Sequence, residues 1–515
     1  MSTGAERLIT AAVTSGVEVC FANPGTTELP LVAALDSVPG VRAVLGLFEG
    51  VCTGAADGYG RVAGRPALTL LHLGPGFANG IANLHNARRA RTPVVNLIGD
   101  HATWHLAADA PLTSDITSLA SPVSGWVRTA ATADGLADDL VDAVAAARTP
   151  PGQVATLIVP VDCQWDSARD EPIAPRPAAK AAAVGTEAIA NAAKAVVAGP
   201  STVLYVGGAA LRARGLRAVA RVQAATGCRV FAETFAATAE RGRHLPWVRS
   251  LPYFPERAVE ALEGADVFVT AGAPPPVSFF AVRGVPSVLI PDGCTHLTLA
   301  EPGDDVEGAL EALADALGAT TDVDLDERAD LEVPSGGRIT ADSAGQAVAA
   351  LLPEGAIVID EAATSGLGFT LLAPAAAPHT TLALTGGAIG SGLPLAVGAA
   401  VAAPDRRIVA LQADGSGMYT LQSLWTMARE SLDVTVVVFS NRRYAILGVE
   451  LHRAGIDPGA IASALTDLSH PDLDWVSLAT GMGDPASRAT TNDEMVEQLR
   501  RSLQTPGPSL IEAAI

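Results

Sequence analysis

The stretch from residue 408 to residue 441 constrains the fold of this chain more than any other part of the sequence. It holds four successive patterns: the apolar run Ile408 to Leu411, the turn Asp414-Gly415-Ser416-Gly417, the helical segment Tyr419 to Glu430 and the apolar run Val434 to Phe439. A strand, a tight turn, a helix and a second strand form one crossover unit of a parallel sheet. The sequence therefore predicts Asp414 and Asn441, which follow the two strands, at the carboxyl ends of two strands in one sheet.

The residue types at this sheet edge suit an anion and a cation held together. Glycines at positions 415 and 417 let the backbone approach a phosphate at a helix N-terminus, where free N–H groups favour negative charge. The Asp414 carboxylate, the Asn441 amide oxygen and a nearby carbonyl are hard oxygen ligands, which suit Mg²⁺ or Ca²⁺. The alternative interpretation is an ordinary α/β turn in which Asp414 only caps a helix.

This motif resembles that of a known enzyme family. An Asp-Gly-Ser turn followed 27 positions later by Asn (441 − 414) is similar to the cofactor motif of the thiamine diphosphate-dependent decarboxylases and acetolactate synthases. The resemblance implies that Asp414, Asn441 and the carbonyl of Arg443 bind Mg²⁺. It also implies that the cofactor is bound by Asp414, Gly415, Ser416, Asn441, Tyr444, Ala445 and Ile446. Ala413 and Ser440 depart from the usual motif, but neither position is a ligand in the family.

Composition excludes several other classes of protein. A chain of 515 residues has room for about three domains, and 49% apolar residues with only 4% aromatics favour close-packed α/β layers. The net charge of −21, without a basic run, argues against nucleic acid and anionic membranes as partners. Five scattered cysteines and an N-terminal stretch without a signal-peptide core predict a soluble, cytoplasmic protein.

Strands alternating with helices predict three doubly wound parallel-sheet domains of the α/β class. We expect a first domain over residues 1–165, a second over 188–320 and a third over 338–515, joined by a Pro/Ala-rich linker at 166–187 and an acidic one at 318–337. The resemblance makes the first the pyrimidine-binding domain and the third the diphosphate-binding domain. In the second, Ser287–Ile290 is an expected strand. The loop VGGAALRARG lacks a dinucleotide fingerprint, so FAD, which some family members hold there, is not indicated.

Glu49 is a lone carboxylate between an apolar strand and a helix of small residues. Without further context, an acidic residue in the first turn of a helix is explained by the helix dipole. The segment FEGVCTGAADGYGR, however, resembles the family signature in which this Glu activates the cofactor by bonding N1′ of its aminopyrimidine ring. An apolar pocket that raises the pKa of the carboxyl would keep its proton available.

Two further turns complete the expected cofactor site. Glu361 belongs to a helix-start turn, Asp360 to Gly366, that can cradle a phosphate. The Gly-rich loop Gly386 to Pro394 carries one bulky residue, Ile389. The resemblance implies that Ile389 is wedged beneath the cofactor to keep its two rings bent, and that Gly387 contacts the cofactor.

The substrate side of the site resembles benzoylformate decarboxylase. Its features are the run NPGTTELP, with Gly25 and Thr26, and His72 before the expected loop Gly74–Gly80, which contains Asn79. The resemblance implies that Thr26 and His72 face the substrate carboxylate and that Gly25 and Asn79 contact the cofactor. His72 as a structural residue holding the loop is the alternative.

These features predict a thiamine diphosphate- and Mg²⁺-dependent enzyme that cleaves or forms C–C bonds next to the carbonyl of a small 2-oxo acid, as an acetolactate-synthase-like carboligase or decarboxylase. The alternatives are a benzoylformate-type non-oxidative decarboxylase and a catalytically weak paralogue that acts as a partner subunit. Because family members place the cofactor between two subunits, we expect at least a homodimer, commonly extended to a homotetramer.

Overall fold

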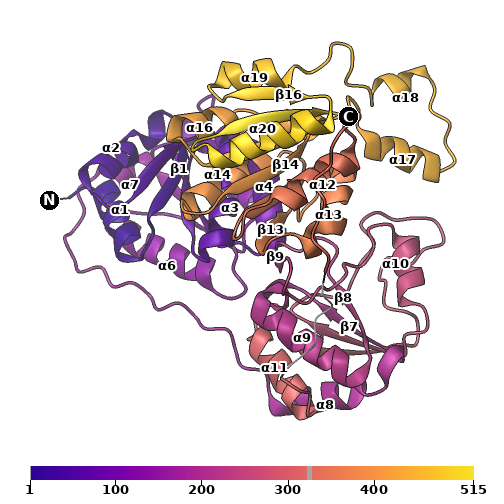
Figure 1. Cartoon of the computed structure of the whole chain (residues 1–515). Coiled ribbons are helices and arrows are strands. Elements are labelled where there is room, and N and C mark those ends of the chain that lie inside the picture. Colours follow the sequence, from indigo (N-terminus) through magenta and orange to yellow (C-terminus); the bar gives the residue numbers. More distant parts are fainter. Residues whose placement is uncertain (1, 322–327) are drawn as a thin grey trace. The chain divides into compact units, whose positions relative to one another are not determined.

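The computed structural model describes residues 2–321 and 328–515. Within them the chain has three mainly parallel sheets, divided between two compact units (Figure 1). The first unit contains the residues up to Ala179, Leu331–Leu372 and Leu384–Ile515, and the second contains the described part of Lys180–Asp330 with Ala373–Ala383. The predicted α/β class with three sheets is confirmed. Residues 322–327 of the expected linker 318–337 lie outside the described residues, and the domain boundaries stay a prediction.

The N-terminal sheet of the first unit has the strand order β2-β1-β3-β4-β6-β5, and its paired strands are parallel. The strands are β1 (Val19–Asn23), β2 (Arg42–Leu45), β3 (Ala67–His72), β4 (Val94–Asp100), β5 (Trp126–Thr129) and β6 (Val154–Pro160). Strands β4 and β6 are buried along their whole length, as continuous apolar runs predict for strands covered on both faces.

Helices cover both faces of this sheet. They are α1 (Gly4–Thr14), α2 (Leu29–Ser37), α3 (Glu49–Ala63), α4 (Leu73–Ala90), α5 (Ile116–Ala120), α6 (Leu136–Arg148) and α7 (Val161–Trp165), with the 3₁₀ turns η1 (Thr26–Glu28), η2 (Leu106–Ala108) and η3 (Ala133–Gly135). Leu8 of α1 and Leu140 of α6 share a buried core with Leu68 of β3 and Leu97 of β4. Helices α3 and α4 pack against the same strands β3 and β4.

Helix α4 differs from the sequence prediction. The expected loop Gly74–Gly80 is helical, because α4 begins at Leu73, directly after His72 ends β3. Pro75 is tolerated there because a helix makes no internal use of the N–H groups in its first turn. Leu73 makes the sharp turn from strand to helix with a φ of 51°. The Gly-Pro-Gly sequence therefore permits a tight strand-to-helix junction rather than an open loop.

The C-terminal sheet of the first unit runs β16-β17-β15-β14-β12, again with parallel pairs. Its strands are β12 (Ile357–Glu361), β14 (Ile408–Ala413), β15 (Val434–Ser440), β16 (Ala486–Ala489) and β17 (Ser509–Ala514). Its helices are α12 (Ala341–Leu351), η6 (Ala363–Gly366), α13 (Leu367–Leu372), α14 (Gly392–Ala402), α15 (Asp414–Gly417), α16 (Ser423–Glu430), α17 (Ala445–Arg453), α18 (Ala460–Ala464), α19 (Trp475–Met482) and α20 (Asn492–Gln504). Strands β14 and β15 pair directly, which confirms the crossover unit predicted from residues 408–441, although its helix α16 begins at Ser423 rather than at Tyr419.

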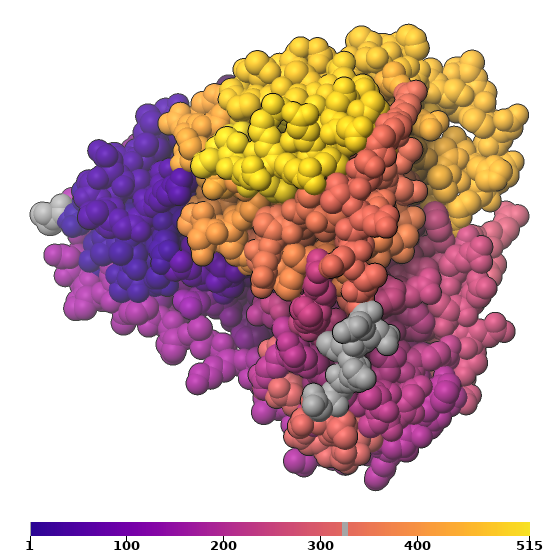
Figure 2. Space-filling view, viewed as in Figure 1, coloured from indigo at the N-terminus to yellow at the C-terminus, as the bar shows by residue number. Residues whose placement is uncertain are grey.

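Helices α3 and α14 join the two halves of the first unit through backbone contact. A Cβ atom at Gly398 of α14 would lie 2.6 Å from the Tyr59 nitrogen, and one at Gly54 of α3 would lie 2.5 Å from Cβ of Pro394. Any larger side chain at these positions would force the helices apart. Glycine thus lets the two helices touch, and Figure 2 shows the N-terminal and C-terminal parts of this unit meeting as one body.

The second unit is a smaller α/β layer. Its parallel sheet runs β11-β10-β7-β8, from β7 (Thr202–Val206), β8 (Arg229–Ala232), β10 (Val267–Ala271) and β11 (Thr295–Ala300), while β9 (Thr238–Arg241) pairs antiparallel with β13 (His379–Ala383). Its helices are α8 (Thr186–Val196), η4 (Gly199–Ser201), η5 (Gly208–Leu211), α9 (Ala213–Thr226), α10 (Pro255–Leu262), α11 (Val306–Ala316) and η7 (Ala373–Ala375). The expected strand Ser287–Ile290 is wrong, because only Val288 forms a bridge there and β11 takes the place beside β10.

Among the helices in residues 2–321 and 328–515, none is both long and apolar enough to cross a membrane. All five cysteines are free thiols, and four of them, Cys20, Cys52, Cys163 and Cys228, are buried.

Candidate functional site

Asp414 and Asn441 meet at the carboxyl edge of the C-terminal sheet. Asp414 follows β14, and its carboxylate accepts the backbone N–H groups of Gly415 and Arg442 at 2.8 and 2.6 Å. The Asn441 side-chain oxygen accepts the N–H of Arg443 at 3.0 Å. Asp414 therefore ties the turn after β14 to the turn after β15, as the strand pattern predicted.

The carboxyl group of Asp414 lies in a buried place. The side chain is 1% exposed, and burial raises the pKa of its carboxyl, while the two N–H bonds lower it and the nearby charge of Glu512 raises it further. A buried carboxylate without a cationic partner is costly, so this position favours a bound cation. Arg442 holds a left-handed φ of 59°, which turns the backbone back towards Asp414.

The aromatic ring of Tyr444 closes the other side of the Asp414 turn. A Cβ atom at Gly415 would lie 2.5 Å from Cε1 of this ring, so only glycine fits beside it. Burial raises the pKa of the Tyr444 hydroxyl, and its hydrogen bond to Tyr419 raises it further. Ser416 accepts a hydrogen bond at 2.5 Å from the Gln412 amide. Ala445 and Ile446, the other two predicted cofactor residues of this region, begin α17.

Glu361 has a role that the sequence did not indicate. Its carboxylate accepts the N–H groups of Gly390 and Gly392 at 2.7 and 2.6 Å, of Ser391 at 3.2 Å, and the Gln412 amide at 3.1 Å. Burial raises the pKa of this carboxyl, and the four N–H bonds oppose that rise. Glu361, the last residue of β12, thus fastens the end of the Gly-rich segment and the start of α14 to that strand. Contact of its side chain with a cofactor stays a prediction.

Glu49 lies at the matching edge of the N-terminal sheet, as the first residue of α3. Its carboxylate accepts the Asn79 amide at 3.0 Å. A Cβ atom at Gly76 would lie 3.0 Å from Oε1 of Glu49 and 3.3 Å from Cβ of His72, so both side chains border the same point. The structure therefore brings together Glu49, His72 and Asn79, three of the residues predicted from the sequence.

A buried carboxylate that sequence reasoning missed orients His72. Nδ1 of His72 lies 2.8 Å from Oε2 of Glu28, a residue with 0% exposure, and Thr27 donates to the other carboxylate oxygen at 2.6 Å. When Glu28 is ionised, its carboxylate only accepts hydrogen bonds, so this contact then places the proton on Nδ1 and leaves Nε2 for another partner. Glu28 also accepts the Gly25 N–H at 2.7 Å, a capping pattern that conceals this second role in the sequence.

The close packing around Glu28 explains two glycines of this region. The Glu28 side chain occupies the space where a Cβ atom of Gly99 would sit, and the His72 ring occupies the space beside Gly25. Asp100 follows Gly99 at the end of β4, and burial together with the charge of Glu28 raises the pKa of its carboxyl. Gly25 therefore supports the position of His72, while its contact with a cofactor stays a prediction. Thr26 is exposed at the start of η1.

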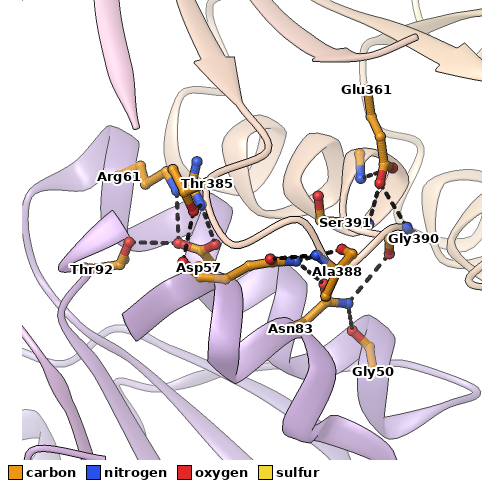
Figure 3. Close-up of polar contacts among 12 residues, drawn as sticks. Gly50, Asp57, Arg61, Asn83, Thr92, Glu361, Thr385, Ala388, Gly390 and Ser391 are labelled. Atoms are coloured by element: carbon orange, nitrogen blue, oxygen red, sulfur yellow. Dashed lines mark hydrogen bonds and ion pairs between the residues drawn. The ribbon is translucent and has the colours of Figure 1, made fainter. Parts of the chain in front are cut away.

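The Gly-rich segment lies against α4, the helix that also carries Asn79. Asn83 of α4 donates to the carbonyl oxygens of Gly50 and Gly390, and Figure 3 shows it between these two residues. Gly387 and Ile389 belong to this segment; Gly387 has a φ of 77° and is exposed, and Ile389 is half-buried. The segment and the start of α3 are thus held to one another inside the first unit.

Comparison with known proteins decides which family this arrangement represents. Residues 2–119 match the N-terminal TPP binding domain of the thiamine pyrophosphate enzymes, and residues 367–513 match their C-terminal TPP binding domain. A Mycobacterium tuberculosis protein that bears the provisional name acetolactate synthase large subunit IlvX is 50% identical over 514 residues, which cover 99% of each chain.

The chain belongs to the thiamine pyrophosphate enzyme family. Benzoylformate decarboxylase of Pseudomonas aeruginosa is 28% identical to it over 526 residues, with 96% of each chain covered. The solved structure of the Rhodococcus jostii RHA1 thiamine diphosphate-dependent 4-hydroxybenzoylformate decarboxylase superposes with a TM-score of 0.87 at 25% identity, covering 100% of this chain and 99% of that one. The fold predicted from the motifs is therefore that of the family along the whole chain.

The residues present fit the family's cofactor. Ser391 Oγ and Gln412 Oε1 are buried polar atoms that find no hydrogen-bond partner within the described residues. Both residues also donate to the Glu361 carboxylate, Ser391 from its main-chain N–H and Gln412 from its side-chain amide. The Asp414 carboxylate, the Asn441 amide and the Arg443 carbonyl supply oxygen donors of the kind that Mg²⁺ prefers. Among the described residues, no group of three or more His, Cys, Asp or Glu side chains could hold a metal ion. The three oxygen donors named here do not form such a group, because Asp414 is the only residue of these four types among them.

Proposed function

We propose that this member of the thiamine pyrophosphate enzyme family uses thiamine diphosphate and Mg²⁺ to cleave the C–C bond next to the carbonyl of a small 2-oxo acid. The observation that carries the proposal is the grouping of Glu49 and His72 around Gly76, with His72 oriented by the buried carboxylate of Glu28. In this proposal one side chain exchanges a proton with the cofactor and the other with the substrate. Such a pair suits a reaction that first removes and then returns a proton.

The two sheet edges would divide the work. Asp414, Asn441 and the Arg443 carbonyl would hold the metal ion, and through it the diphosphate. Glu49 would hold a proton at N1′ of the aminopyrimidine ring. When bound, thiamine diphosphate supplies the electron sink for the decarboxylation of 2-oxo acids. With Nδ1 bonded to Glu28, His72 would present Nε2 to the substrate carboxylate or give a proton to the product.

Different observations support two alternative outcomes of the reaction. The acetolactate-synthase-like outcome, in which the fragment is joined to a second carbonyl compound, is supported by the 50% identity to the Mycobacterium tuberculosis protein. The benzoylformate-type outcome, in which the fragment is protonated and released as an aldehyde, is supported by the Glu28–His72 pair, which offers a proton donor at the site. A catalytically weak partner subunit is disfavoured because Glu49, Asp414 and Asn441 are all present.

The decisive experiment is a panel of 2-oxo acids, from pyruvate to benzoylformate, incubated with the protein, thiamine diphosphate and Mg²⁺. We expect CO₂ release with at least one of them, and product analysis by NMR separates aldehydes from 2-hydroxy ketones and acetohydroxy acids. His72→Ala serves as the matched variant, because the loss of its proton should slow an aldehyde-forming reaction more strongly than a reaction that joins two carbonyl compounds. Cofactor binding without turnover of any acid would favour the partner-subunit alternative.

We also propose that the working form is at least a homodimer, commonly a homotetramer, in the cytoplasm. The support is the family itself, in which subunits share the cofactor. Light scattering coupled to size-exclusion chromatography measures the assembly directly, and a protein that turns over substrate as a monomer would contradict it.

A further inference from the structure

Two loops at the carboxyl edge of the C-terminal sheet contain residues that the sequence predicts to contact the cofactor. One is the Gly-rich segment Gly386 to Ser391, which contains neither helix nor strand and carries Ile389 between Gly387 and Gly390, both of positive φ. The other is the turn formed by α15. Both loops lie in the expected domain 338–515 of one chain, so a cofactor shared between two subunits would meet both of them.

Glu361 stands between these two loops. It is the last residue of β12 and lies directly opposite Gln412 on the paired strand β14. Its Oε1 accepts the N–H groups of Gly390 and Ser391 at 2.7 and 3.2 Å, and Figure 3 shows the carboxylate directed at these two residues. Its Oε2 accepts the N–H of Gly392 at 2.6 Å and the Gln412 amide at 3.1 Å. A single carboxylate thus binds the end of the segment and reaches β14.

Gln412 carries the contact on to the second loop. Its side-chain nitrogen donates to Oγ of Ser416 at 2.5 Å as well as to Glu361, so both of its N–H groups are used. Ser416 Oγ in turn donates to the carbonyl of Ala413, the residue before α15, at 3.2 Å. The side chains of Glu361, Gln412 and Ser416 are all buried. Loss of one partner therefore leaves an unpaired polar group inside the protein, which is costly.

The same cluster fixes the main chain directly after Ile389. The N–H of Gly390, which belongs to the peptide bond that follows Ile389, donates to Glu361. The carbonyl of Gly390 accepts the hydroxyl of Thr420 at 2.8 Å. Gly390 has a φ of 94°, and a Cβ atom there would lie 2.5 Å from Cβ of Tyr419. Residues of the C-terminal sheet and its turns therefore set where the backbone of Ile389 lies.

We propose that Glu361 is a positioning residue that fixes Ile389 relative to the Asp414 turn, an inference that rests on the proposed function. A carboxylate has about four lone-pair sites, and four donors of the protein occupy those of Glu361. Its negative charge would also repel a diphosphate. Glu361 therefore acts through the two loops rather than by touching the cofactor. It sets the bulky residue of one loop against the turn that would hold the metal ion.

Glu361→Gln is the matched variant, because it keeps the shape of the side chain. An amide has one oxygen, so it can accept from only one of the two pairs of donors, and its NH₂ group would face the other pair. Asp433→Asn is the control, since Asp433 also accepts a backbone N–H, that of Gly507, at the opposite end of β15. In the unliganded proteins, deuterium exchange followed by mass spectrometry should be faster across 386–392 in Glu361→Gln and unchanged there in Asp433→Asn.

Measurements with the cofactor give the second readout. Calorimetric titration with thiamine diphosphate and Mg²⁺ should show an affinity reduced about tenfold in Glu361→Gln. Exchange of the cofactor C2 proton at saturation, followed by NMR, should slow by about 10²-fold, because a displacement of about 1 Å costs that much. Ile389→Ala should slow it as well. If Glu361 acts through Ile389, the double variant should exchange no more slowly than the slower single variant.

Independent effects that multiply in the double variant would overturn the proposal. If Glu361→Gln does not fold, Gln412→Met takes its place, because it removes the bridge to Ser416 and leaves the three backbone bonds of Glu361. Wild-type affinity and C2 exchange in Gln412→Met would then contradict the proposal. A wild-type protein that binds no thiamine diphosphate would overturn the proposed function, whereas unchanged deuterium exchange across 386–392 in Glu361→Gln would overturn this inference alone.

Discussion

The two sheet edges of the first unit use their carboxylates in different ways. At the C-terminal edge, Asp414 and Glu361 accept mainly backbone N–H groups, two for the former and three for the latter. At the N-terminal edge, Glu49 accepts a side-chain amide, and Glu28 bonds to the His72 ring and the Thr27 hydroxyl in addition to one backbone N–H, that of Gly25.

The difference separates carboxylates that hold a ligand in place from carboxylates that take part in proton exchange. A carboxylate surrounded by backbone N–H groups is fixed in position, which suits the binding of a metal ion and a diphosphate. A carboxylate beside an imidazole can change the proton distribution of that ring, which suits acid–base chemistry. Substitutions at the first edge should therefore cost binding, and substitutions at the second should cost turnover while binding survives.

The largest effect is expected at the C-terminal edge. Asp414→Ala or Asn441→Ala should abolish Mg²⁺-dependent retention of thiamine diphosphate, because the charge of the diphosphate would lose its main counter-ion. Calorimetry with and without Mg²⁺ measures this. Asp433→Ala is the control, since Asp433 also bonds a backbone N–H, that of Gly507, at the opposite end of β15. Unchanged cofactor affinity in both site variants would remove the distinction between the edges.

At the N-terminal edge, Glu49→Gln should keep the fold and the cofactor but lose most turnover. An amide of the same shape still reaches Asn79 and the ring, yet it cannot exchange a proton. Exchange of the cofactor C2 proton, followed by NMR, should slow by orders of magnitude. Glu18→Gln, a change in a surface pair with Arg65, should leave that rate unaltered. Wild-type exchange in Glu49→Gln would disprove the assigned role.

Substitution of His72 separates its role from that of Glu28 within the N-terminal edge. His72→Ala should lower turnover of 2-oxo acids by about 10²–10⁴-fold, the usual contribution of general acid–base help, with little change in cofactor affinity. Glu28→Gln should give a smaller loss, because the ring remains but its tautomer is no longer set by a carboxylate. Steady-state kinetics and calorimetry on the same preparations decide this. Loss of cofactor at an unchanged rate per occupied site would make His72 structural.

The smallest effect concerns a carboxyl outside both edges. Asp484 is 1% exposed, and within the described residues neither of its oxygens has a hydrogen-bond partner. Burial raises its pKa to about 8, whereas an unfolded aspartate titrates near pH ~4. Between these two pH values the folded state binds more protons than the unfolded state. The free energy of unfolding therefore falls as pH rises from about 4 to about 8.

Asp484→Asn should remove that fall. We expect the variant to match the wild type near pH 5 and to exceed its stability by about 1–3 kcal/mol near pH 9, since a neutral amide avoids burying a charge. Denaturant unfolding at pH 5, 7 and 9 measures the difference. If the free energies of unfolding of the two proteins depended on pH in the same way, Asp484 would have hydrogen-bond partners in solution, as the carboxylates of the two sheet edges have in this structure.

The sequence predicted the C-terminal edge better than the N-terminal one, for a physical reason. The hydrogen bond from Arg442 to Asp414 joins the ends of two consecutive strands, so the spacing of Asp414 and Asn441 along the chain is itself the signal. Glu28 and His72 are 44 residues apart, and Glu28 also completes a local cap, which is sufficient to explain it from sequence. Similarly, Asn86 and Ala388 are 302 residues apart, and no local pattern connects them.

Two errors in the elements have equally local causes. Glycine and proline in Gly74–Gly80 predicted a loop, but the first turn of a helix accepts both, and α4 includes them. The apolar run Ser287–Ile290 has the composition of a strand, yet the place beside β10 is taken by β11, a more polar segment. Strand propensity is decided by the neighbours available, which composition does not reveal.

The contact between α3 and α14 has a consequence for protein engineering. Because Gly54 and Gly398 bring the backbones of these helices together, each helix is shaped for one specific partner. Recombination between homologous enzymes is commonly attempted at domain borders, and a crossover between residues 165 and 338 would pair α3 of one parent with α14 of the other. Chimaeras that inherit both helices from a single parent should fold, whereas those that mix them should fail wherever one parent carries a larger residue at either glycine.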